Sequence, residues 1–304
     1  MSIALMERPV IETASEVLEP GCLLHDGYYA ITELLSWSSF GITYLAADRN
    51  GRAVIIKECY PSAFCERHGL NVVPRDSAAA PVLEATLYLF LQDARSLAKL
   101  QHPNIACVER VFEENATAYI VVEFIDGLDL LEIIEHSWPQ LSADNVRDLL
   151  NKTLDALDKV HSAGLLHRDI SPENIIVTGA NEPVLIDFGA TLKTLARRAG
   201  SRSELPISKS SYAPHEFFVS GSKQDTTGDF YALAASFYHL ITGVMPVDGQ
   251  ARLSAHLAGK PDPYIPLSHL TDDFDMAFCN ALDCALSILP KDRVRSAEEW
   301  QRNL

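Results

Sequence analysis

Apolar residues alternate with polar ones early in the chain and recur at helical spacing later, which divides the chain into two parts. Over residues 28–60, β-branched and aromatic residues predict three short strands of a sheet. Over 83–100, apolar positions recur every three or four residues, which predicts a helix with one buried face. From residue 127 onward the pattern is mainly helical. These patterns predict an α+β fold with a small β-rich N-terminal lobe and a larger helical C-terminal lobe, whose clearest helices fall at 141–163, 226–242 and 274–288.

Breaks in the periodic pattern give the expected boundaries. Residues 1–20 are polar, contain prolines and have no clear period, so we expect a lead-in segment. We assign the N-terminal lobe to residues 21–125 and the C-terminal lobe to 126–304. The long connection before the helix at 83–100 is rich in proline and glycine, which indicates an extra hairpin around residues 68–71.

Hydroxyl side chains mark candidate starts for two helices. Ser142 has Asn145 three residues later, and Thr271 has Phe274 at the same spacing. An N-cap oxygen accepts a hydrogen bond from a backbone N–H two or three residues on, so both pairs predict helix N-termini.

Composition narrows the class of protein. The 304-residue chain is 47% hydrophobic, which is ample for a packed core. Its six cysteines show no C-x-x-C spacing, so we expect reduced core thiols and neither a zinc site nor disulfides. The apolar stretch at the start is too short for a signal peptide, and no apolar run approaches a membrane span. These features predict a cytoplasmic protein.

The charge balance limits the expected partners. A formal net charge of -16 argues against nucleic acid and against an anionic membrane surface as partners. The same field would favour a basic protein substrate. An alternative of equal weight is that the acidity only keeps the protein soluble.

Candidate chemistry is concentrated in two short motifs. His167-Arg168-Asp169 is followed by Asn174, and Asp187-Phe188-Gly189 begins thirteen residues after that asparagine. Apolar runs at 175–177 and 184–186 flank a turn and predict a hairpin that brings the motifs together. One aspartate that accepts a hydroxyl proton, with an asparagine and a second aspartate that hold metal ions, suits the transfer of a γ-phosphate.

The two motifs resemble those of the protein kinase superfamily, H-R-D-x-x-x-x-N and D-F-G. Other landmarks follow in chain order over about residues 28 to 304, and their local sequences are similar to those of bacterial Ser/Thr kinases. The resemblance implies a bilobal protein kinase-like fold, ATP and Mg²⁺ as cofactors, and a protein Ser/Thr hydroxyl as acceptor. The landmarks are Val54-Ile55-Ile56-Lys57, His102-Pro103-Asn104-Ile105, the strand Tyr119 to Ile125, Tyr212-Ala213-Pro214-His215-Glu216 and Asp229-Phe230-Tyr231-Ala232-Leu233.

The resemblance implies a role for each site residue. Asp169 would act as the base or orient the substrate hydroxyl, and Arg168 would pair with a phosphorylated loop. Lys57 would contact the α- and β-phosphates and pair with Asp93. Asn174 and Asp187 would bind Mg²⁺. Nucleotide contacts are expected from Gly41, Ser38, Ile55, Glu123, Ile125, Ile176 and Asp129, the last reaching the ribose unless it is simply an exposed acid.

Other residues of the motifs are expected to be structural. His167 and Phe188 would stack in the core of the larger lobe. Asp229 would accept backbone hydrogen bonds from the catalytic loop, and Arg293 would pair with Glu216.

Departures from the family pattern keep a second function open. Ser36 and Ser38 replace two glycines of the phosphate-binding loop, Asp93 stands for the usual glutamate, and Ile55 and Ser171 replace an alanine and a lysine. His215 replaces a proline of the activation segment. The first hypothesis is an active Ser/Thr protein kinase. The alternative is a pseudokinase, a nucleotide-binding or scaffold module that uses the fold without efficient catalysis.

Residues 190–212 are rich in serine, lysine and arginine. Autophosphorylation there would give Arg168 a partner and order the loop. An unmodified, solvated loop is an equal alternative.

Overall fold

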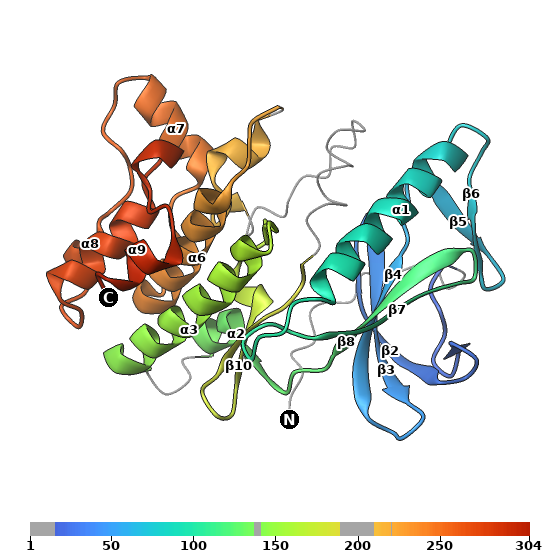
Figure 1. Cartoon of the computed structure of the whole chain (residues 1–304). Helices are drawn as coiled ribbons and strands as arrows, with labels where there is room; N and C mark the ends of the chain where they lie inside the picture. Colours follow the sequence, from blue (N-terminus) through green and yellow to red (C-terminus); the bar gives the residue numbers. More distant parts are fainter. Residues whose placement is uncertain (1–15, 137–140, 189–209, 220) are drawn as a thin grey trace. The chain divides into compact units, whose positions relative to one another are not determined.

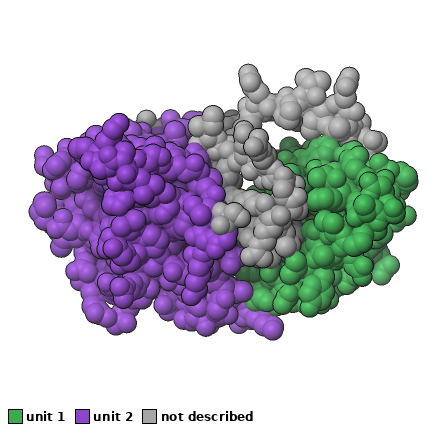
Figure 2. All heavy atoms as spheres, turned by 90° about the horizontal axis from the view of Figure 1, so that it is seen from above, with its two compact units in different colours: residues 1–98, 108–124 green, residues 99–107, 125–304 purple. Residues whose placement is uncertain are grey.

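The computed structural model describes residues 16–136, 141–188, 210–219 and 221–304, which cluster into two compact units. Unit 1 holds the chain up to Ala98 together with Val108–Phe124, and unit 2 holds Lys99–Cys107 and Ile125–Leu304 (Figure 2). The units divide beside the expected boundary at residue 125, and the short segment before Val108 clusters with unit 2.

Unit 1 is built on a six-stranded antiparallel sheet in the order β1-β2-β3-β4-β8-β7 (Figure 1). Strands β2, β3 and β4 confirm the three strands predicted over residues 28–60. Residues alternate along β4, where Val54, Ile56 and Glu58 are buried and the residues between them are partly exposed. The strands are β1 (Leu23–Leu24), β2 (Tyr29–Trp37), β3 (Gly41–Asp48), β4 (Ala53–Cys59), β7 (Val108–Glu114) and β8 (Thr117–Glu123).

A hairpin and a helix connect β4 to β7. Strands β5 (Cys65–His68) and β6 (Asn71–Pro74) form the hairpin, which confirms the one predicted around residues 68–71. Helix α1 (Ala80–Leu97) packs against β7 and β8 and begins three residues before the predicted range (Figure 1). The N-cap Ala79 receives no side-chain cap, and a proline lies at the first helical positions, where it is well tolerated. In the turn before the helix, the carboxylate of Asp76 accepts hydrogen bonds from the N–H groups of Ala78 and Ala79.

Unit 2 is mainly helical around the buried helix α6. Thirteen consecutive α6 residues, from Thr227 to His239, are buried, as expected of a helix covered on all sides. A small sheet in the order β11-β10-β9 carries the motif hairpin, which confirms that prediction. Its strands are β9 (Gly127–Asp129), β10 (Ile175–Thr178) and β11 (Pro183–Leu185). The helices are α2 (Leu130–Glu135), α3 (Ala143–Ser162), α6 (Thr226–Thr242), α7 (Gly249–Leu257), α8 (Met276–Ala285) and α9 (Ala297–Gln301), with short 3₁₀ turns η1 (Pro172–Asn174), η2 (His215–Phe218), η3 (Leu267–His269) and η4 (Pro290–Asp292).

The two N-cap predictions had different outcomes. Ser142 caps α3 and accepts a hydrogen bond from the N–H of Asn145 at 3.2 Å, as predicted. The prediction for Thr271 was wrong, because Asp275 caps α8 and accepts from the N–H of Phe278 at 2.9 Å. Asp275 lies four residues further on, so the hydroxyl of Thr271 accepts instead from Asp273.

The prediction that all cysteines are reduced and buried is only partly confirmed. All six cysteines are free thiols, and Cys59, Cys65 and Cys279 are buried. Cys107 and Cys284 are exposed, so placing them in the core was wrong. In the part of the chain that the structure describes, every helix is too short or too polar to cross a membrane.

A buried ion pair joins distant parts of unit 2. Nη1 of Arg293 lies 2.5 Å from Oε1 of Glu216, and Nη2 lies 3.0 Å from Oε2, so the contact is bidentate. The Arg293 side chain is 0% exposed and also donates to the carbonyl oxygens of Ser287 and Ile288. This pair confirms the predicted partnership and attaches η2 to the C-terminal part of the unit.

Replacing Arg293 by methionine should strongly destabilise unit 2, because Glu216 keeps its buried charge and loses its guanidinium partner. We expect a loss of about 3–5 kcal/mol in the free energy of unfolding. Urea denaturation followed by circular dichroism measures it. The matched control is Arg302→Met, which breaks an exposed pair with Glu298 and should leave stability nearly unchanged. Equal effects of the two variants would contradict the assignment.

Candidate active site

The catalytic loop (residues 167–174) lies in unit 2 and is held by a buried carboxylate. Asp229, in the first turn of α6, is 1% exposed. It accepts hydrogen bonds from the backbone N–H of His167 at 2.9 Å and of Arg168 at 2.7 Å, and lies 2.9 Å from Nε2 of His161. A buried acid thereby gains the donors that it needs. The predicted contact between Asp229 and the loop is confirmed.

Each of the two motifs contains one residue with a left-handed backbone. Arg168 has a φ of 60° and Asp187 a φ of 62°. Residues other than glycine seldom adopt this conformation, which costs on the order of 1–3 kcal/mol each. The bond from the N–H of Arg168 to Asp229 helps to maintain the first of them.

His167 joins the two motifs through its ring. Complete burial lowers the pKa of His167, so the ring is neutral, with one donor and one acceptor nitrogen. Nε2 lies 3.1 Å from the carbonyl oxygen of Ile186, and Nδ1 lies 3.4 Å from the backbone nitrogen of Asp169. A proton on Nε2 satisfies both contacts. The ring lies 4.4 Å from that of Phe188 between centroids, in the expected structural pairing.

Asn174, one of the two expected metal ligands, contacts the expected catalytic residue Asp169 and the backbone before the second ligand, Asp187. Its amide nitrogen donates to the carbonyl oxygen of Asp169 at 2.6 Å and to Oδ2 at 3.2 Å. Its backbone oxygen accepts from the N–H of Ile186, directly before Asp187. The amide nitrogen is therefore occupied, and the amide oxygen is the atom left to bind a cation. Within the described residues there is no cluster of three or more His, Cys, Asp or Glu that fits a metal.

Two buried polar atoms of the catalytic loop lack a hydrogen-bond partner among the described residues, namely Nε of Arg168 and Oγ of Ser171. Burial of such an atom without a partner is unfavourable. Arg168 is the residue expected to pair with a phosphorylated loop. The predicted modification segment, 190–212, lies outside the described residues except for its last three positions.

In unit 1, Lys57 lies on the central strand β4, between Thr43 of β3 and Ile120 of β8. Ile55 shares its face of the strand, as expected for two residues that meet one ligand. Asp93 lies on α1 in the same unit and is partly buried. Pairing of Lys57 with Asp93 stays a prediction.

The phosphate-loop turn (residues 38–41) is closed by the side chain of Ser38. Its Oγ accepts from the N–H groups of Phe40 at 3.3 Å and Gly41 at 3.2 Å, and donates to the carbonyl oxygen of Gly41. These amides are among the groups expected to meet phosphate. Glycine is required at Gly41, because an added Cβ would lie 2.7 Å from the carbonyl oxygen of Glu58. Sequence reasoning anticipated the serine but missed this internal contact.

The remaining predicted nucleotide residues lie on both units. Glu123 ends β8 in unit 1, whereas Ile125 lies in unit 2. Ile176 of β10 pairs with Asp129 of β9. Asp129 is also the N-cap of α2, in a capping box whose carboxylate accepts from the N–H of Glu132 at 2.8 Å. The spacing of Asp129 and Glu132 is the sequence signal that would have revealed it.

Comparison with known proteins identifies the family. A family model described as the protein kinase domain matches residues 83–298. The chain belongs to the protein kinase domain family. This kinase domain is 29% identical over 215 residues to the probable serine/threonine-protein kinase PknB of Lactococcus lactis, covering 71% of the chain and 34% of that protein. It is 29% identical over 314 residues to serine/threonine-protein kinase F of Synechocystis, covering 97% and 59%.

Solved structures agree with the fold. The structure titled PpkA-294 apo form has a TM-score of 0.79 and 30% identity, covering 95% of the kinase domain described here and 99% of that chain. The kinase domain of PknI from M. tuberculosis has a TM-score of 0.65 and 25% identity, covering 94% and 97%. The predicted α+β kinase fold is confirmed. The chain spans between 34% and 59% of the two curated relatives named above.

Substituting Ser38 by glycine should strengthen the binding of Mg-ATP. The variant frees the two amides that the hydroxyl now occupies, and we expect about fivefold tighter binding. Titration with a fluorescent ATP analogue measures the dissociation constant. Ser39→Gly, in the same turn, is the control for added flexibility and should not tighten binding. Equal or weaker binding by Ser38→Gly would show that the hydroxyl does not compete with phosphate.

Burial raises the pKa of Asp129 to about 6, which makes its ionisation unfavourable to folding. Between the unfolded pKa and this value the folded state binds more protons, so stability falls as pH rises. Asparagine is about as effective as aspartate at the N-cap of a helix. At pH values above 6, Asp129→Asn should therefore have a higher thermal midpoint than the unaltered chain. The difference in midpoint should disappear as the pH is lowered toward 4.

The N-cap Asp275 provides a control of opposite sign. A hydrogen bond from the N–H of Phe278 lowers the pKa of Asp275, so its contribution is present at neutral pH and is lost on acidification. Asp275→Asn should lower the midpoint at neutral pH and matter less in acid. A pH-independent effect of Asp129→Asn in the same melts would refute the assignment.

Proposed function

We propose that this chain is an ATP-dependent protein kinase that transfers the γ-phosphate to a serine or threonine hydroxyl of a protein, with Mg²⁺. The observation that carries the proposal is the linkage of Asp169, Asn174 and the backbone before Asp187. The names of the relatives support the same activity, since they are serine/threonine kinases.

The donor set fits the proposed cofactors. An amide oxygen from Asn174 and a carboxylate from Asp187 are ligands that Mg²⁺ accepts, with phosphate oxygens completing its shell. When bound, the ion would neutralise charge on the transferring phosphoryl group. Lys57 would bind the α- and β-phosphates as a point charge.

Asp169 would hold the acceptor hydroxyl and take its proton. Its N–H and its Oδ2 are both engaged, by His167 and Asn174 respectively, which restricts the rotation of the carboxylate. A base held in one orientation loses little freedom when substrate arrives. Because His167 is neutral and buried, we assign it to holding the loop and not to proton transfer.

The pseudokinase alternative rests on departures that would weaken nucleotide binding or slow transfer, although the sequence retains Lys57, Asp169, Asn174 and Asp187. Ser38 occupies two amides of the phosphate loop, which would lower affinity for ATP. Ser171 stands where the family pattern has a lysine, and the loss of that positive charge would slow phosphoryl transfer. We therefore propose an active enzyme with moderate nucleotide affinity.

A basic protein substrate is part of the proposal, because a net charge of -16 would attract it over long range. Autophosphorylation between residues 190 and 212 is the proposed source of a phosphate for Arg168. The absence of nucleic acid and of a membrane among the partners, and a cytoplasmic location, stay predictions from the sequence.

Asp169→Asn should abolish transfer while leaving nucleotide binding intact. Intact-mass spectrometry measures phosphate incorporation into a basic acceptor protein. We expect this incorporation to fall by about 10³-fold, since the base is lost. Asp187→Asn should abolish both transfer and the thermal shift produced by Mg-ATP, whereas Asp169→Asn should keep that shift. Asp158→Asn, on the exposed surface of α3, is the matched control. A thermal shift without transfer by the unaltered chain would favour the pseudokinase.

A further inference from the structure

A buried ion pair lies on the face of β4 opposite to Lys57. Glu58 follows Lys57 directly, so strand alternation directs the two side chains to opposite faces. Glu58 is 0% exposed, and its Oε2 lies 2.6 Å from Nη2 of Arg67, whose side chain is 1% exposed. Arg67 belongs to β5, in the hairpin between β4 and α1. Charges buried to this degree need complete pairing.

Two tyrosines from the flanking strands complete the contacts of Glu58. Tyr44 of β3 donates to Oε2 at 3.0 Å, and Tyr119 of β8 donates to Oε1 at 2.8 Å. Burial raises the pKa of both hydroxyls, so both remain protonated and act as donors. Side-chain contacts to Glu58 therefore connect β4 to both neighbouring strands, in addition to the backbone ladder.

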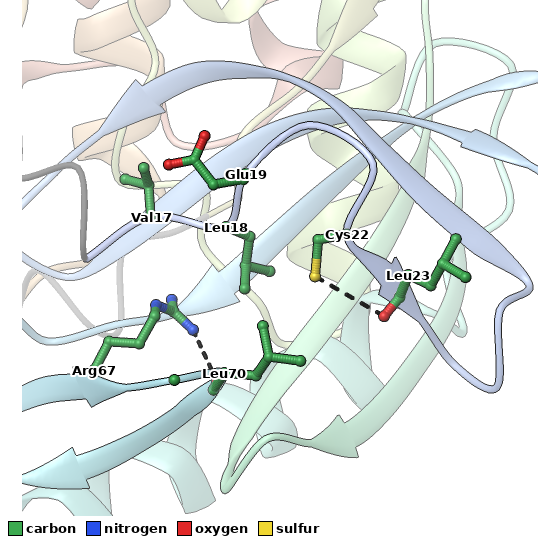
Figure 3. Close-up of a pocket in the computed structure, with 8 residues that line it drawn as sticks. Val17, Leu18, Glu19, Cys22, Leu23, Arg67 and Leu70 are labelled. Carbon is green, nitrogen blue, oxygen red and sulfur yellow. Dashed lines mark hydrogen bonds between the residues drawn. The ribbon is translucent and has the colours of Figure 1, made fainter.

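Arg67 connects this cluster to the N-terminal segment (residues 16–24). Nε donates to the carbonyl oxygen of Glu16 at 2.9 Å. Nη1 donates to the carbonyl oxygen of Leu70 at 3.0 Å (Figure 3). The N–H of Leu18 donates to the hydroxyl of Tyr44. Arg67 also lines a cavity of about 620 Å³ with Val17, Leu18, Glu19, Cys22, Leu23, Gly69 and Leu70 (Figure 3).

The backbone of Glu58 touches two of the expected phosphate-binding residues. Lys57 precedes it in the strand. Gly41 lies so close that an added Cβ would be 2.7 Å from the Glu58 carbonyl oxygen, and Gly41 pairs with Cys59 in the ladder. A displacement of Glu58 would therefore move Lys57 and the phosphate-loop turn together.

We propose that Glu58 and Arg67 are positioning residues that hold Lys57 and Gly41 in place for the phosphates of the nucleotide. This inference rests on the proposed function. Both act through the backbone of β4, from the face away from Lys57. A buried charge pair with tyrosine donors is satisfied in one arrangement, whereas apolar contacts tolerate small shifts of a strand.

The test separates positioning from general stability. Arg67→Met alone leaves Glu58 charged and unpaired and should lower the thermal midpoint. The double variant Glu58→Gln with Arg67→Met removes both charges. Its amide oxygen accepts from one tyrosine and its amide nitrogen donates to the hydroxyl of the other, so the midpoint should largely recover. Ile31→Ala, in the buried face of β2, is the destabilised control. Lys57→Met gives the reference for lost phosphate contact.

Two readouts are compared on the full chain. Titration with Mg-ATP should show about tenfold weaker binding by the double variant, and Ile31→Ala should bind as the unaltered chain does. Hydrogen exchange should become faster in peptides from β4 of the double variant and stay unchanged in β10. This combination, with the midpoint recovered, supports positioning.

The contrary outcomes are distinct. If the double variant binds Mg-ATP as tightly as the unaltered chain, or if Ile31→Ala weakens binding equally, the positioning role is overturned while the proposed function stands. If the unaltered chain binds no Mg-ATP, the proposed function fails, and the role of Glu58 and Arg67 in phosphate contacts fails with it.

Discussion

A carboxylate that is buried on folding needs hydrogen-bond donors to replace water, and the backbone of the catalytic loop supplies them to Asp229. Its contacts with the N–H groups of His167 and Arg168 place Arg168 in its left-handed conformation. The next residue is Asp169, the proposed catalytic residue, which Asn174 contacts at both its carbonyl and its carboxylate. The geometry of the proposed chemistry in unit 2 thus depends on one buried acid, which α6 carries in its first turn.

Unit 1 meets the same constraint with a different solution. Glu58 is also buried, but its three donors are the side chains of Arg67, Tyr44 and Tyr119 and not backbone amides. These partners come from the β5-β6 hairpin and from β3 and β8, so the cluster joins the hairpin to the sheet and adds side-chain contacts to the ladder between β4 and its two neighbours. In each unit a buried carboxylate acts next to a proposed catalytic group: Glu58 follows Lys57 directly, and Asp229 binds the N–H groups of the two residues before Asp169. The pairing of these acids is what gives the neighbouring functional side chains a defined place.

Periodicity predicted most elements, because the burial of one face leaves a local pattern. Strands β2 to β4, the hairpin at 175–185 and helices α3 and α6 were all expected close to where they lie. The errors have local physical reasons. Thr271 was preferred as a cap although Asp275 lies nearer to the first buried turn of α8, and Cys107 and Cys284 were placed in the core on residue type alone. Residue type gives a tendency toward burial, whereas the position on an element decides it.

The sequence by itself determined the family and most of the order of the elements, and it supplied the proposed catalytic side chains, since motif spacing and periodicity are properties of neighbouring residues. Only the tertiary structure decided which groups satisfy the buried charges. Asp229 and His167 are 62 residues apart, and Glu58 and Tyr119 are 61 apart. No local pattern encodes such pairs, because they form only when separate elements pack and exclude the water that would otherwise solvate each charge.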